Sequence, residues 1–506
     1  MGSLGGLEFT NSSSPHEFKP LDHEEFRKQA HKMVDYIADY YKNIEKYPVL
    51  SQVKPGYLVS SLPQTAPCNP ESFEAIVEDV SKYILPGMTH WLNPNFFAFF
   101  PATVSSAGFV GDMLCNAFNS VGFNWLASPA ATELEMVVMD WLASMLKLPK
   151  SFMFSGTGGG VIHGTTSEAV ICTLVAARER AMQSMKHDYD PSKLIVYGSD
   201  QTHSTFAKAC KLIGIPLSNV RLIPTSLHSN FSLPPSLLQK SIQADVAAGF
   251  VPLYLCVTVG TTSTAAVDPL EDLVNIADDY GIWVHVDAAY AGNACICPEF
   301  RHYLDGVEGV DSLSMAPHKW LLTYLDCCCL WVKNRTLLTK ALNTNPEYLK
   351  NKLSDSNSVV DYKDWQIGTG RRFKSLRLWF VLRTYGITNL QTHIRSDVFM
   401  ARIFNNLVRS DARFEIVAPV NFSLVCFRFN PNKLPVVESD KIESMNRELL
   451  ERINSTGRVY MTHTIAGGVY MLRFAVGTTL TQEHHVVAAW DLIKNQAEAI
   501  ISNNLN

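Results

Sequence analysis

The chain has 506 residues, with 43 Lys and Arg against 48 Asp and Glu, a formal net charge of −5 and a pI near 6.3. This balance gives no reason to expect a nucleic-acid or anionic lipid surface. Hydrophobic residues make up 47% of the chain and charged residues 18%, so a large core and a subunit interface can both be buried.

The sequence also lacks the usual signs of export, membrane insertion and metal binding. No apolar run approaches the ~20 residues of a membrane span, and the N-terminus has no basic region followed by an apolar core. The 11 cysteines are odd in number, and neither Cys295–Cys297 nor Cys327–Cys329 has the spacing of a zinc site. We therefore expect reduced thiols, no metal and a cytoplasmic protein.

The N-terminal hundred residues divide into three stretches. Residues 1–20 are rich in Gly, Ser and Asn and are predicted to be disordered. Asp22 and Glu25 form a capping pair ahead of apolar residues at helical spacing up to Ile44. This amphipathic helix must bury its apolar stripe against its own domain or a second subunit, and composition does not choose between them. Residues 88–102 follow, dense in aromatic side chains that could be core or pocket wall.

A glycine-rich turn at residues 152–168 precedes a predicted helix. A dinucleotide-binding frame beginning at Gly156 would need glycine at position 161, which is Val161. A single phosphate held at the helix N-terminus by backbone N–H groups and hydroxyls explains Thr165, Thr166 and Ser167 better.

Apolar strands recur across residues 150–335, and each ends in polar side chains. The strand from Lys193 leads to His203, the strand 251–259 leads to Thr262, and the strand from Ile282 ends at Asp287. Strands alternating with helical patterns predict an α/β fold with a doubly wound, mostly parallel sheet. The polar groups at the strand ends are expected to meet at one edge of that sheet.

Asp287 and Lys319 are the two residues with the clearest chemistry. Burial disfavours the charged form of a lysine, and a neutral amine can bond to a carbonyl cofactor. Pyridoxal phosphate needs such a lysine for its aldehyde and a carboxylate beside its pyridine nitrogen. Alone, Lys319 could equally be a packed lysine at the end of a strand, and Asp287 a helix cap. Their separation of 32 positions allows two adjacent strands to bring them together.

Farther along, residues 343–365 read as a long polar loop that could act as a lid. From about residue 390, alternating stretches and helical patterns predict a small α+β domain. We expect a tail at 1–20, an N-terminal helical segment at 21–105, a large domain at 106–385 and a C-terminal domain at 386–506.

Three blocks of the sequence resemble a known family. Residues 285–292 (HVDAAYAG), 296–301 (ICPEFR) and 317–320 (PHKW) resemble the aromatic amino-acid decarboxylases of the group II pyridoxal-phosphate decarboxylases. Similar blocks extend from about Glu24 to His485, and their sequence is similar to that of the plant tryptophan decarboxylases. The resemblance implies a pyridoxal-phosphate enzyme of fold type I, with the N-terminal segment packed across a homodimer and the active site at the subunit interface.

The resemblance also implies roles for individual residues. It implies that Lys319 holds the cofactor aldehyde, Asp287 faces the ring nitrogen, and His203 stacks on the ring and moves protons. The implied cofactor-binding residues are Thr166, Ser167, His203, Thr262, Asp287, Ala289, His318 and Lys319. The implied substrate-binding residues are Trp91, Phe99, Phe100, Pro101, Ala102, Val121, Phe123, His203, His318, Tyr348 and Gly370, with Val121 and Phe123 supplied by the neighbouring subunit.

Two positions bear on reaction and substrate. Tyr348 matches a loop tyrosine that protonates the substrate carbon after carbon dioxide leaves, where related aldehyde synthases have phenylalanine. Gly370 matches a glycine of tryptophan enzymes, where tyrosine enzymes have serine, although it could serve only a turn. We therefore expect conversion of L-tryptophan to tryptamine and carbon dioxide, with 5-hydroxytryptophan another candidate substrate.

Several alternatives remain open. They are a tyrosine or DOPA decarboxylase, an aromatic aldehyde synthase, an aminotransferase and a catalytically dead binding protein. Two positions depart from the family pattern. Ala316 replaces an asparagine found in animal relatives, so no phosphate contact is assigned to it, and Asn293 replaces the usual serine with an effect that the sequence does not reveal.

Overall fold

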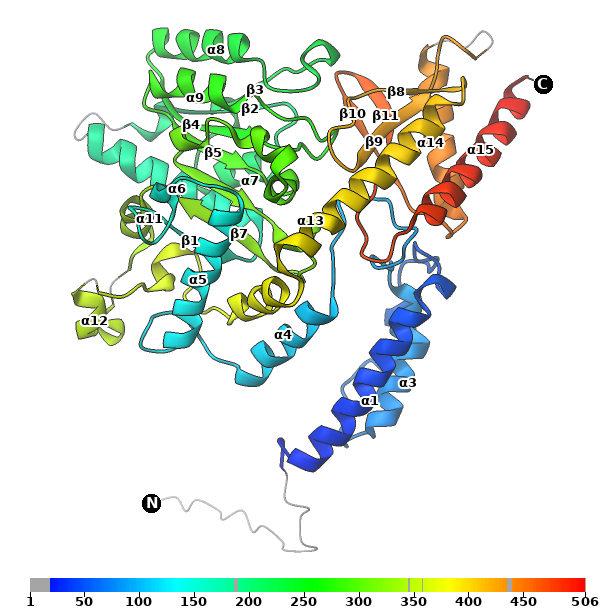
Figure 1. The fold of residues 1–506 in the computed structure, drawn as a ribbon, viewed down its shortest axis with the longest axis horizontal. Coiled ribbons are helices and arrows are strands. Elements are labelled where there is room, and N and C mark those ends of the chain that lie inside the picture. Colours follow the sequence, from blue (N-terminus) through cyan, green and yellow to red (C-terminus); the bar gives the residue numbers. More distant parts are fainter. Residues whose placement is uncertain (1–18, 186–189, 345, 357, 435–438, 506) are drawn as a thin grey trace, which may run out of the picture.

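The computed structural model describes residues 19–185, 190–344, 346–356, 358–434 and 439–505. The predicted tail therefore lies almost entirely outside the described residues. Within them, a large α/β lobe and a smaller α+β lobe are joined by one long helix, and an N-terminal group of helices projects from the body (Figure 1). The predicted fold class is confirmed.

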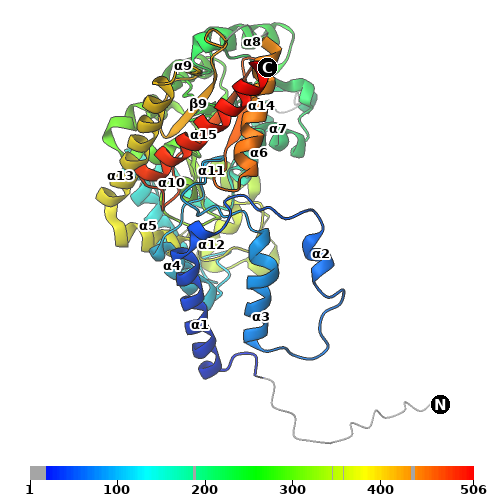
Figure 2. The same ribbon diagram turned by 90° about the vertical axis from the view of Figure 1, so that its right-hand side faces the viewer.

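The N-terminal helices stand apart from the rest of the protomer. Asp22 caps the first helix by accepting hydrogen bonds from the N–H groups of Glu24 and Glu25. That helix, α1, has no buried residue, and it lies beside α3 away from the main body (Figure 2). The elements are α1 (His23–Lys42), a 3₁₀ turn (Ile44–Lys46), α2 (Tyr57–Ser61), α3 (Phe73–Asp79), a π-turn (Val80–Ile84) and a 3₁₀ turn (Leu85–Gly87).

The large lobe is built on a seven-stranded sheet with the order β1-β7-β6-β5-β4-β2-β3. Strand β7 runs in the direction opposite to the other six strands of this sheet, so the predicted mostly parallel arrangement is confirmed. The strands are β1 (Gly159–His163), β2 (Leu194–Ser199), β3 (Val220–Ile223), β4 (Val251–Thr258), β5 (Trp283–Asp287), β6 (Ser312–Met315) and β7 (Cys328–Val332).

Helices cover both faces of this sheet, as a doubly wound fold requires. Along β2, Leu194 and Val196 join the core formed with α6, α7 and α11, while Ile195 and Tyr197 join the core formed with α5, α8 and α9. The helices are α4 (Ser106–Phe118), α5 (Pro129–Met145), α6 (Thr166–Met185), α7 (Thr205–Leu212), α8 (Pro235–Ala247), α9 (Leu270–Asp278), α10 (Pro317–Trp320) and α11 (Arg335–Leu342).

Short helical turns fill the connections. The region expected to be a long polar loop contains three of them, separated by irregular chain. The 3₁₀ turns are Lys150–Phe152, Pro191–Lys193, Leu217–Asn219, Leu227–Ser229, Ala291–Ile296, Pro298–Leu304, Val307–Gly309, Glu347–Leu349 and Tyr362–Trp365, and α12 is Lys352–Asp355.

The long helix α13 (Lys374–Arg409) runs from the large lobe into the small one and is broken at Gly386. The backbone there has φ 64° and ψ 172°, a conformation that glycine adopts at little cost. The small lobe is a four-stranded antiparallel sheet, β10-β11-β9-β8, whose core is shared with the C-terminal part of α13 and with α14 and α15. Its elements are β8 (Phe414–Ile416), β9 (Leu424–Phe429), α14 (Ser439–Ser455), β10 (Thr462–Ala466), β11 (Val469–Ala475) and α15 (Glu483–Leu505).

All 11 cysteines are unpaired, and only Cys68 is exposed. This agrees with the expected reduced thiols. Among the described residues, no helix combines the length and the apolar character needed to cross a membrane.

Candidate active site

One cavity of about 240 Å³ lies at the carboxyl ends of the central strands. Strands β5 and β6 are parallel neighbours, with Asp287 in register with Ser314, and the short helix α10 carries Lys319 one turn beyond β6. Because parallel strands end at the same edge, the two side chains meet there. All eight predicted cofactor-binding residues line this cavity: Thr166, Ser167, His203, Thr262, Asp287, Ala289, His318 and Lys319.

Lys319 is enclosed by the cavity wall. Burial lowers the pKa of its ammonium, while the Asp287 carboxylate opposes this shift. No described residue forms a hydrogen bond or an ion pair with Nζ, which lies 5.8 Å from the centre of the Phe100 ring. An amine that loses its proton easily and has no competing partner is suited to bond an aldehyde.

Asp287 lies at the end of β5 and is almost fully buried. Its Oδ1 accepts a hydrogen bond of 3.0 Å from the N–H of Ala289. Thr258, its register partner on β4, also lines the cavity, and its buried Oγ1 has no hydrogen-bond partner among the described residues. Buried polar atoms are normally satisfied, so this wall fits a polar ligand.

The N-terminus of α6 forms the opposite end of the cavity. The N–H of Glu168 donates to the carbonyl of Thr165, whereas the N–H groups of Thr166 and Ser167 precede the first turn of helical bonds. The Thr166 hydroxyl accepts from Cys328 Sγ at 3.7 Å, and the Ser167 hydroxyl lies 3.2 Å from Thr205 Oγ1. Free N–H groups and hydroxyls at a helix N-terminus fit a phosphate.

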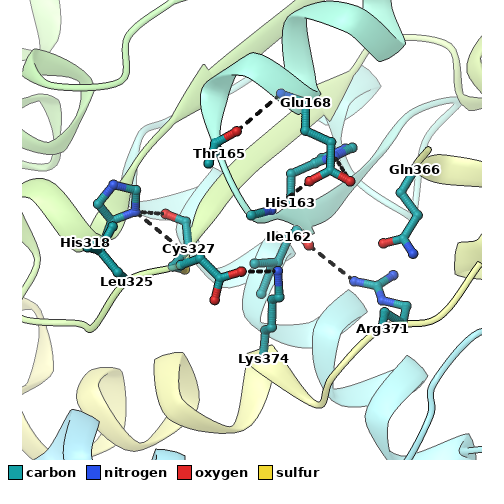
Figure 3. A network of polar contacts seen from close by, with 12 residues as sticks. Ile162, His163, Thr165, Glu168, His318, Leu325, Cys327, Gln366, Arg371 and Lys374 are labelled. Atoms are coloured by element: carbon teal, nitrogen blue, oxygen red, sulfur yellow. Dashed lines mark hydrogen bonds and ion pairs between the residues drawn. The ribbon is translucent and has the colours of Figure 1, made fainter. Parts of the chain in front are cut away.

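Two histidines line the cavity, and both have lowered pKa values, chiefly because they are buried. Nδ1 of His203 accepts from the N–H of Thr205 at 3.1 Å. His318 has a pKa of about 4, and its Nδ1 lies 2.7 Å from the carbonyl oxygen of Cys327 (Figure 3). The N–H of Cys327 also lies 3.2 Å from this Nδ1, so the backbone of Cys327 holds the ring in either tautomer.

A polar network supports the turn that leads into α6 (Figure 3). Burial would raise the pKa of Glu168, but the adjacent His163, the N–H of Gly164 and the charge of Lys374 lower it to about 2. Glu168 accepts from Gly164 N–H at 2.9 Å and lies 3.5 Å from His163 Nδ1. Lys374 in turn pairs with Asp326 at 2.7 Å. The ionised carboxylate thus joins β1 to α6, and Lys374 joins the start of α13 to the segment that follows Lys319.

The predicted substrate residues fall into two groups. Phe100 lines the cavity with the two histidines and stacks on Tyr290 at 3.6 Å. Pro101 and Ala102 follow Phe100 directly in the chain, and Trp91 stacks on Phe99 at 5.5 Å. Phe99 borders a larger hollow of about 710 Å³, which shares His203 and Thr262 with the cavity. Trp91, Phe99, Pro101 and Ala102 do not line the cavity itself.

The second group comes from other segments of the chain and also lies outside the cavity of its own protomer: Val121, Phe123, Tyr348 and Gly370. The N–H of Gly122 donates to the carbonyl of Arg371 at 3.1 Å, which places residues 121–123 beside residues 370–371. A Cβ built on Gly370 would lie 4.0 Å from Val121 Cγ1 and would meet no other group within that distance. Tyr348 is 83% exposed.

Leu325 and Arg473 were not predicted from the sequence to belong to the site. Leu325 lines the cavity although it is 60% exposed, and Arg377 holds its carbonyl at 2.8 Å. Arg473 lies behind Phe100, with its guanidinium 5.3 Å from the ring centre, and bonds to the carbonyls of Ser263 and Phe99. Arg473 has no carboxylate partner among the described residues, which is unusual for a nearly buried arginine. Its sequence context on β11 is nevertheless that of an ordinary strand.

The geometry therefore fits pyridoxal phosphate, with an amine for the aldehyde, a carboxylate for the ring nitrogen and a helix N-terminus for the phosphate. The family model described as "Pyridoxal-dependent decarboxylase conserved domain" matches residues 55–430. The chain belongs to the pyridoxal-dependent decarboxylase family. The expected family and cofactor are confirmed.

Individual relatives place this decarboxylase more closely. It is 68% identical over 503 residues to tryptophan decarboxylase TDC2 of Camptotheca acuminata, covering 99% of this chain and 100% of the relative. Phenylacetaldehyde synthase of a Rosa hybrid cultivar is 57% identical, over 96% of each chain. The crystal structure of Catharanthus roseus tryptophan decarboxylase in complex with L-tryptophan matches with a TM-score of 0.91 at 65% identity, covering 96% of this chain and 100% of that chain.

Proposed function

We propose that this decarboxylase converts an aromatic L-amino acid, above all L-tryptophan, to the corresponding amine and carbon dioxide. The observation that carries the reaction is the meeting of Lys319, Asp287 and the N-terminus of α6 in one cavity walled by Phe100. The open space at Gly370 and the 68% identity to a tryptophan decarboxylase support an indole substrate.

Bound pyridoxal phosphate supplies an electron sink for the electron pair released when the carboxylate leaves. Thr166 and Ser167 hold the phosphate, with Thr262, Ala289 and His318 lining the remaining wall. Lys319 holds the aldehyde until the substrate amine takes its place. Asp287 keeps a negative charge beside the ring nitrogen and so favours its protonated form.

His203 and Tyr348 are proposed to handle protons. His203 has a lowered pKa and is therefore neutral at pH 7, so one ring nitrogen can accept a proton while the other donates. Tyr348 is proposed to protonate the substrate carbon after carbon dioxide leaves. Trp91, Phe99, Phe100, Pro101 and Ala102 are proposed to hold the aromatic side chain and exclude water.

We also propose a homodimer whose active sites lie at the subunit interface. Several apolar side chains of α4 and of the residues after it are exposed, among them Val110 at 46%, Phe118 at 59% and Val121 at 49%. No residue of helix α1 is fully buried in its own protomer. A second copy of the chain would cover both surfaces. It would also receive Val121, Phe123, Tyr348 and Gly370 at its cavity, which would complete the proposed substrate pocket.

The proposed domains are an N-terminal dimerisation segment at 21–105, the cofactor-binding domain at 106–385 and a C-terminal domain from Gly386, where α13 breaks. A cytoplasmic location is proposed from the unpaired cysteines, and localisation of a fluorescent fusion would test it.

The test of function is a competition assay. The purified, cofactor-loaded protein is incubated with equal L-tryptophan, L-tyrosine, L-DOPA and L-phenylalanine, and the products are identified by mass. Tryptamine as the main product supports the proposal. Tyramine or dopamine would keep the reaction and overturn the substrate, an aldehyde with peroxide would make the chain an aldehyde synthase, and no product would indicate a binding protein. A requirement for a keto acid would indicate an aminotransferase.

A further inference from the structure

Asn293 occupies a fully buried position behind the cavity, in the 3₁₀ turn that follows β5. Its Nδ2 lies 3.1 Å from the carbonyl oxygen of Ala289, 2.8 Å from that of Tyr290 and 3.1 Å from that of Ala316. Three acceptors around one atom fix the orientation of the amide, because the reverse orientation would place an oxygen against three carbonyl oxygens. Its Oδ1 is buried without a partner among the described residues.

Two of these carbonyls belong to the turns that carry the reactive side chains. Ala289 donates its N–H to the Asp287 carboxylate at 3.0 Å, and its carbonyl accepts the N–H of Ala316 at 3.1 Å. The carbonyl of Ala316 accepts the N–H of Lys319 at 2.9 Å. The Asn293 amide therefore joins a short chain of hydrogen bonds that runs from the Asp287 carboxylate to the backbone of Lys319.

The Asn293 amide is the side-chain donor to the carbonyls of Ala289 and Ala316. Ala289 and Ala316 have no polar side chains, and each carbonyl can accept two hydrogen bonds. Loss of a donor from a buried carbonyl is costly because no solvent replaces it. A serine hydroxyl at this position, the residue usual in the resembling family, has one hydrogen and can satisfy one carbonyl at a time.

We propose that Asn293 is a positioning residue that sets the placement of Asp287 relative to Lys319 by holding the carbonyls of Ala289 and Ala316 together. The inference rests on the cofactor roles proposed for Asp287 and Lys319. Asn293 itself does not line the cavity, so it acts through these two turns and not by contact with cofactor or substrate.

The test compares Asn293→Ser and Asn293→Ala with matched substitutions of Asn446. Asn446 is equally buried, and its side chain donates to the carbonyl of Ile442 at 2.7 Å and accepts from the N–H of Phe429 at 3.0 Å. Asn446 lies on α14, in the small lobe. Three quantities are measured for each variant: the Tm, the dissociation constant of pyridoxal phosphate, and the pH midpoint of the absorbance band of the lysine-bound cofactor.

We expect the Asn293 and Asn446 variants to lower the Tm to a similar extent. Only the Asn293 variants should also weaken cofactor binding, by roughly tenfold for alanine, and shift the pH midpoint by about half a unit or more. Asn293→Ser should fall between wild type and Asn293→Ala. Should Asn293→Ala fail to fold, the serine variant carries the test because it retains one donor.

Cofactor affinity and pH midpoint at wild-type values in the Asn293 variants would refute the inference. Equal changes in the Asn446 variants would refute it too, since they would indicate a general loss of stability. A Lys319→Ala control separates this failure from failure of the proposed function. If that variant keeps the absorbance band of lysine-bound cofactor, the proposed role of Lys319 is wrong, whatever the Asn293 variants do.

Discussion

At the scale of single residues, Tyr348 is the side chain proposed to decide between amine and aldehyde. It is 83% exposed on the turn Glu347–Leu349, and we propose that its phenol donates a proton to the substrate carbon. Tyr348→Phe keeps the ring and removes that proton. We expect amine formation to fall roughly a hundredfold, with aldehyde, ammonia and hydrogen peroxide appearing in the presence of oxygen. A peroxide assay and product masses measure this, and pure amine at the wild-type rate would contradict the role of Tyr348.

Gly370 is the residue at which substrate choice can be tested. An added Cβ would meet only Val121, at 4.0 Å, so serine can be accommodated without backbone strain. We expect Gly370→Ser to lower kcat/KM for tryptophan by about 10- to 100-fold, because the hydroxymethyl group takes up space required by the indole. The value for tyrosine should rise, since the new hydroxyl can bond a phenol.

Gly368 offers a control for this substitution. The nearest atom to a Cβ built there is the carbonyl oxygen of Gly370, at 3.9 Å, so serine also fits at this position two residues away. Gly368→Ser should leave the ratio of the two kcat/KM values near that of wild type. An equal change of the ratio in both variants would mean that the loop conformation, and not the space at position 370, sets the preference.

At the scale of elements, a buried ion pair joins α5, β1 and the loop after Gly370. Arg371 Nη2 lies 2.6 and 2.8 Å from the carboxylate oxygens of Glu135, which also accepts from the N–H of Ile162. Arg371→Met would leave that carboxylate buried without its partner, which typically costs about 3–5 kcal/mol. We expect a clear loss in the free energy of unfolding, measured by denaturant titration.

The exposed pair Arg395–Glu299 supplies the control, since its side chains are 45% and 44% exposed. Arg395→Met should cost less than about 1 kcal/mol, because solvent screens the pair. Equal losses in the two variants would show that burial does not determine the contribution of these arginines.

The elements also show which features could be read from the sequence. The apolar strands that end in Asp287 and His203 were predictable, because a buried strand needs a continuous apolar run and the polar residue after it marks the sheet edge. The antiparallel direction of β7 was not, since the same apolar run fits either direction. Nor was the course of α13 through Gly386, because a glycine inside a helical pattern is also compatible with a helix end.

Some residues of the candidate site could be predicted from the sequence and others could not. Lys319, Asp287 and the turn before α6 could be inferred from chemistry and spacing. The sequence alone did not reveal the surroundings of Arg473 and Asn293, whose partners belong to segments distant in the chain or to backbone carbonyls. Resemblance supplied Val121, Phe123, Tyr348 and Gly370 as pocket residues, yet they lie outside the cavity of their own protomer. That separation leads from the single chain to the assembly.

At the scale of the whole molecule, the proposed dimer can be tested with two variants that each form little amine. Lys319→Ala removes the amine of one cavity, and Tyr348→Phe removes the proton donor. If Tyr348 serves the partner's cavity, a hybrid dimer contains one cavity with both Lys319 and a tyrosine. Co-expressed variants carrying different tags, purified through both tags, should therefore form amine at about half the wild-type rate per dimer. Each variant alone should form little.

If Tyr348 instead serves its own cavity, every cavity of the hybrid lacks one of the two groups and no amine production returns. Sedimentation of the wild-type chain must first show a dimer at the assay concentration, because a monomer would refute the shared site directly. A dimer in which both chains carry Tyr348→Phe provides the background rate, because it keeps the amine of Lys319 and lacks the proton donor. Recovered amine formation above that background would establish that neither protomer holds a complete site and that the exposed apolar faces around Val121 serve the reaction as well as the assembly.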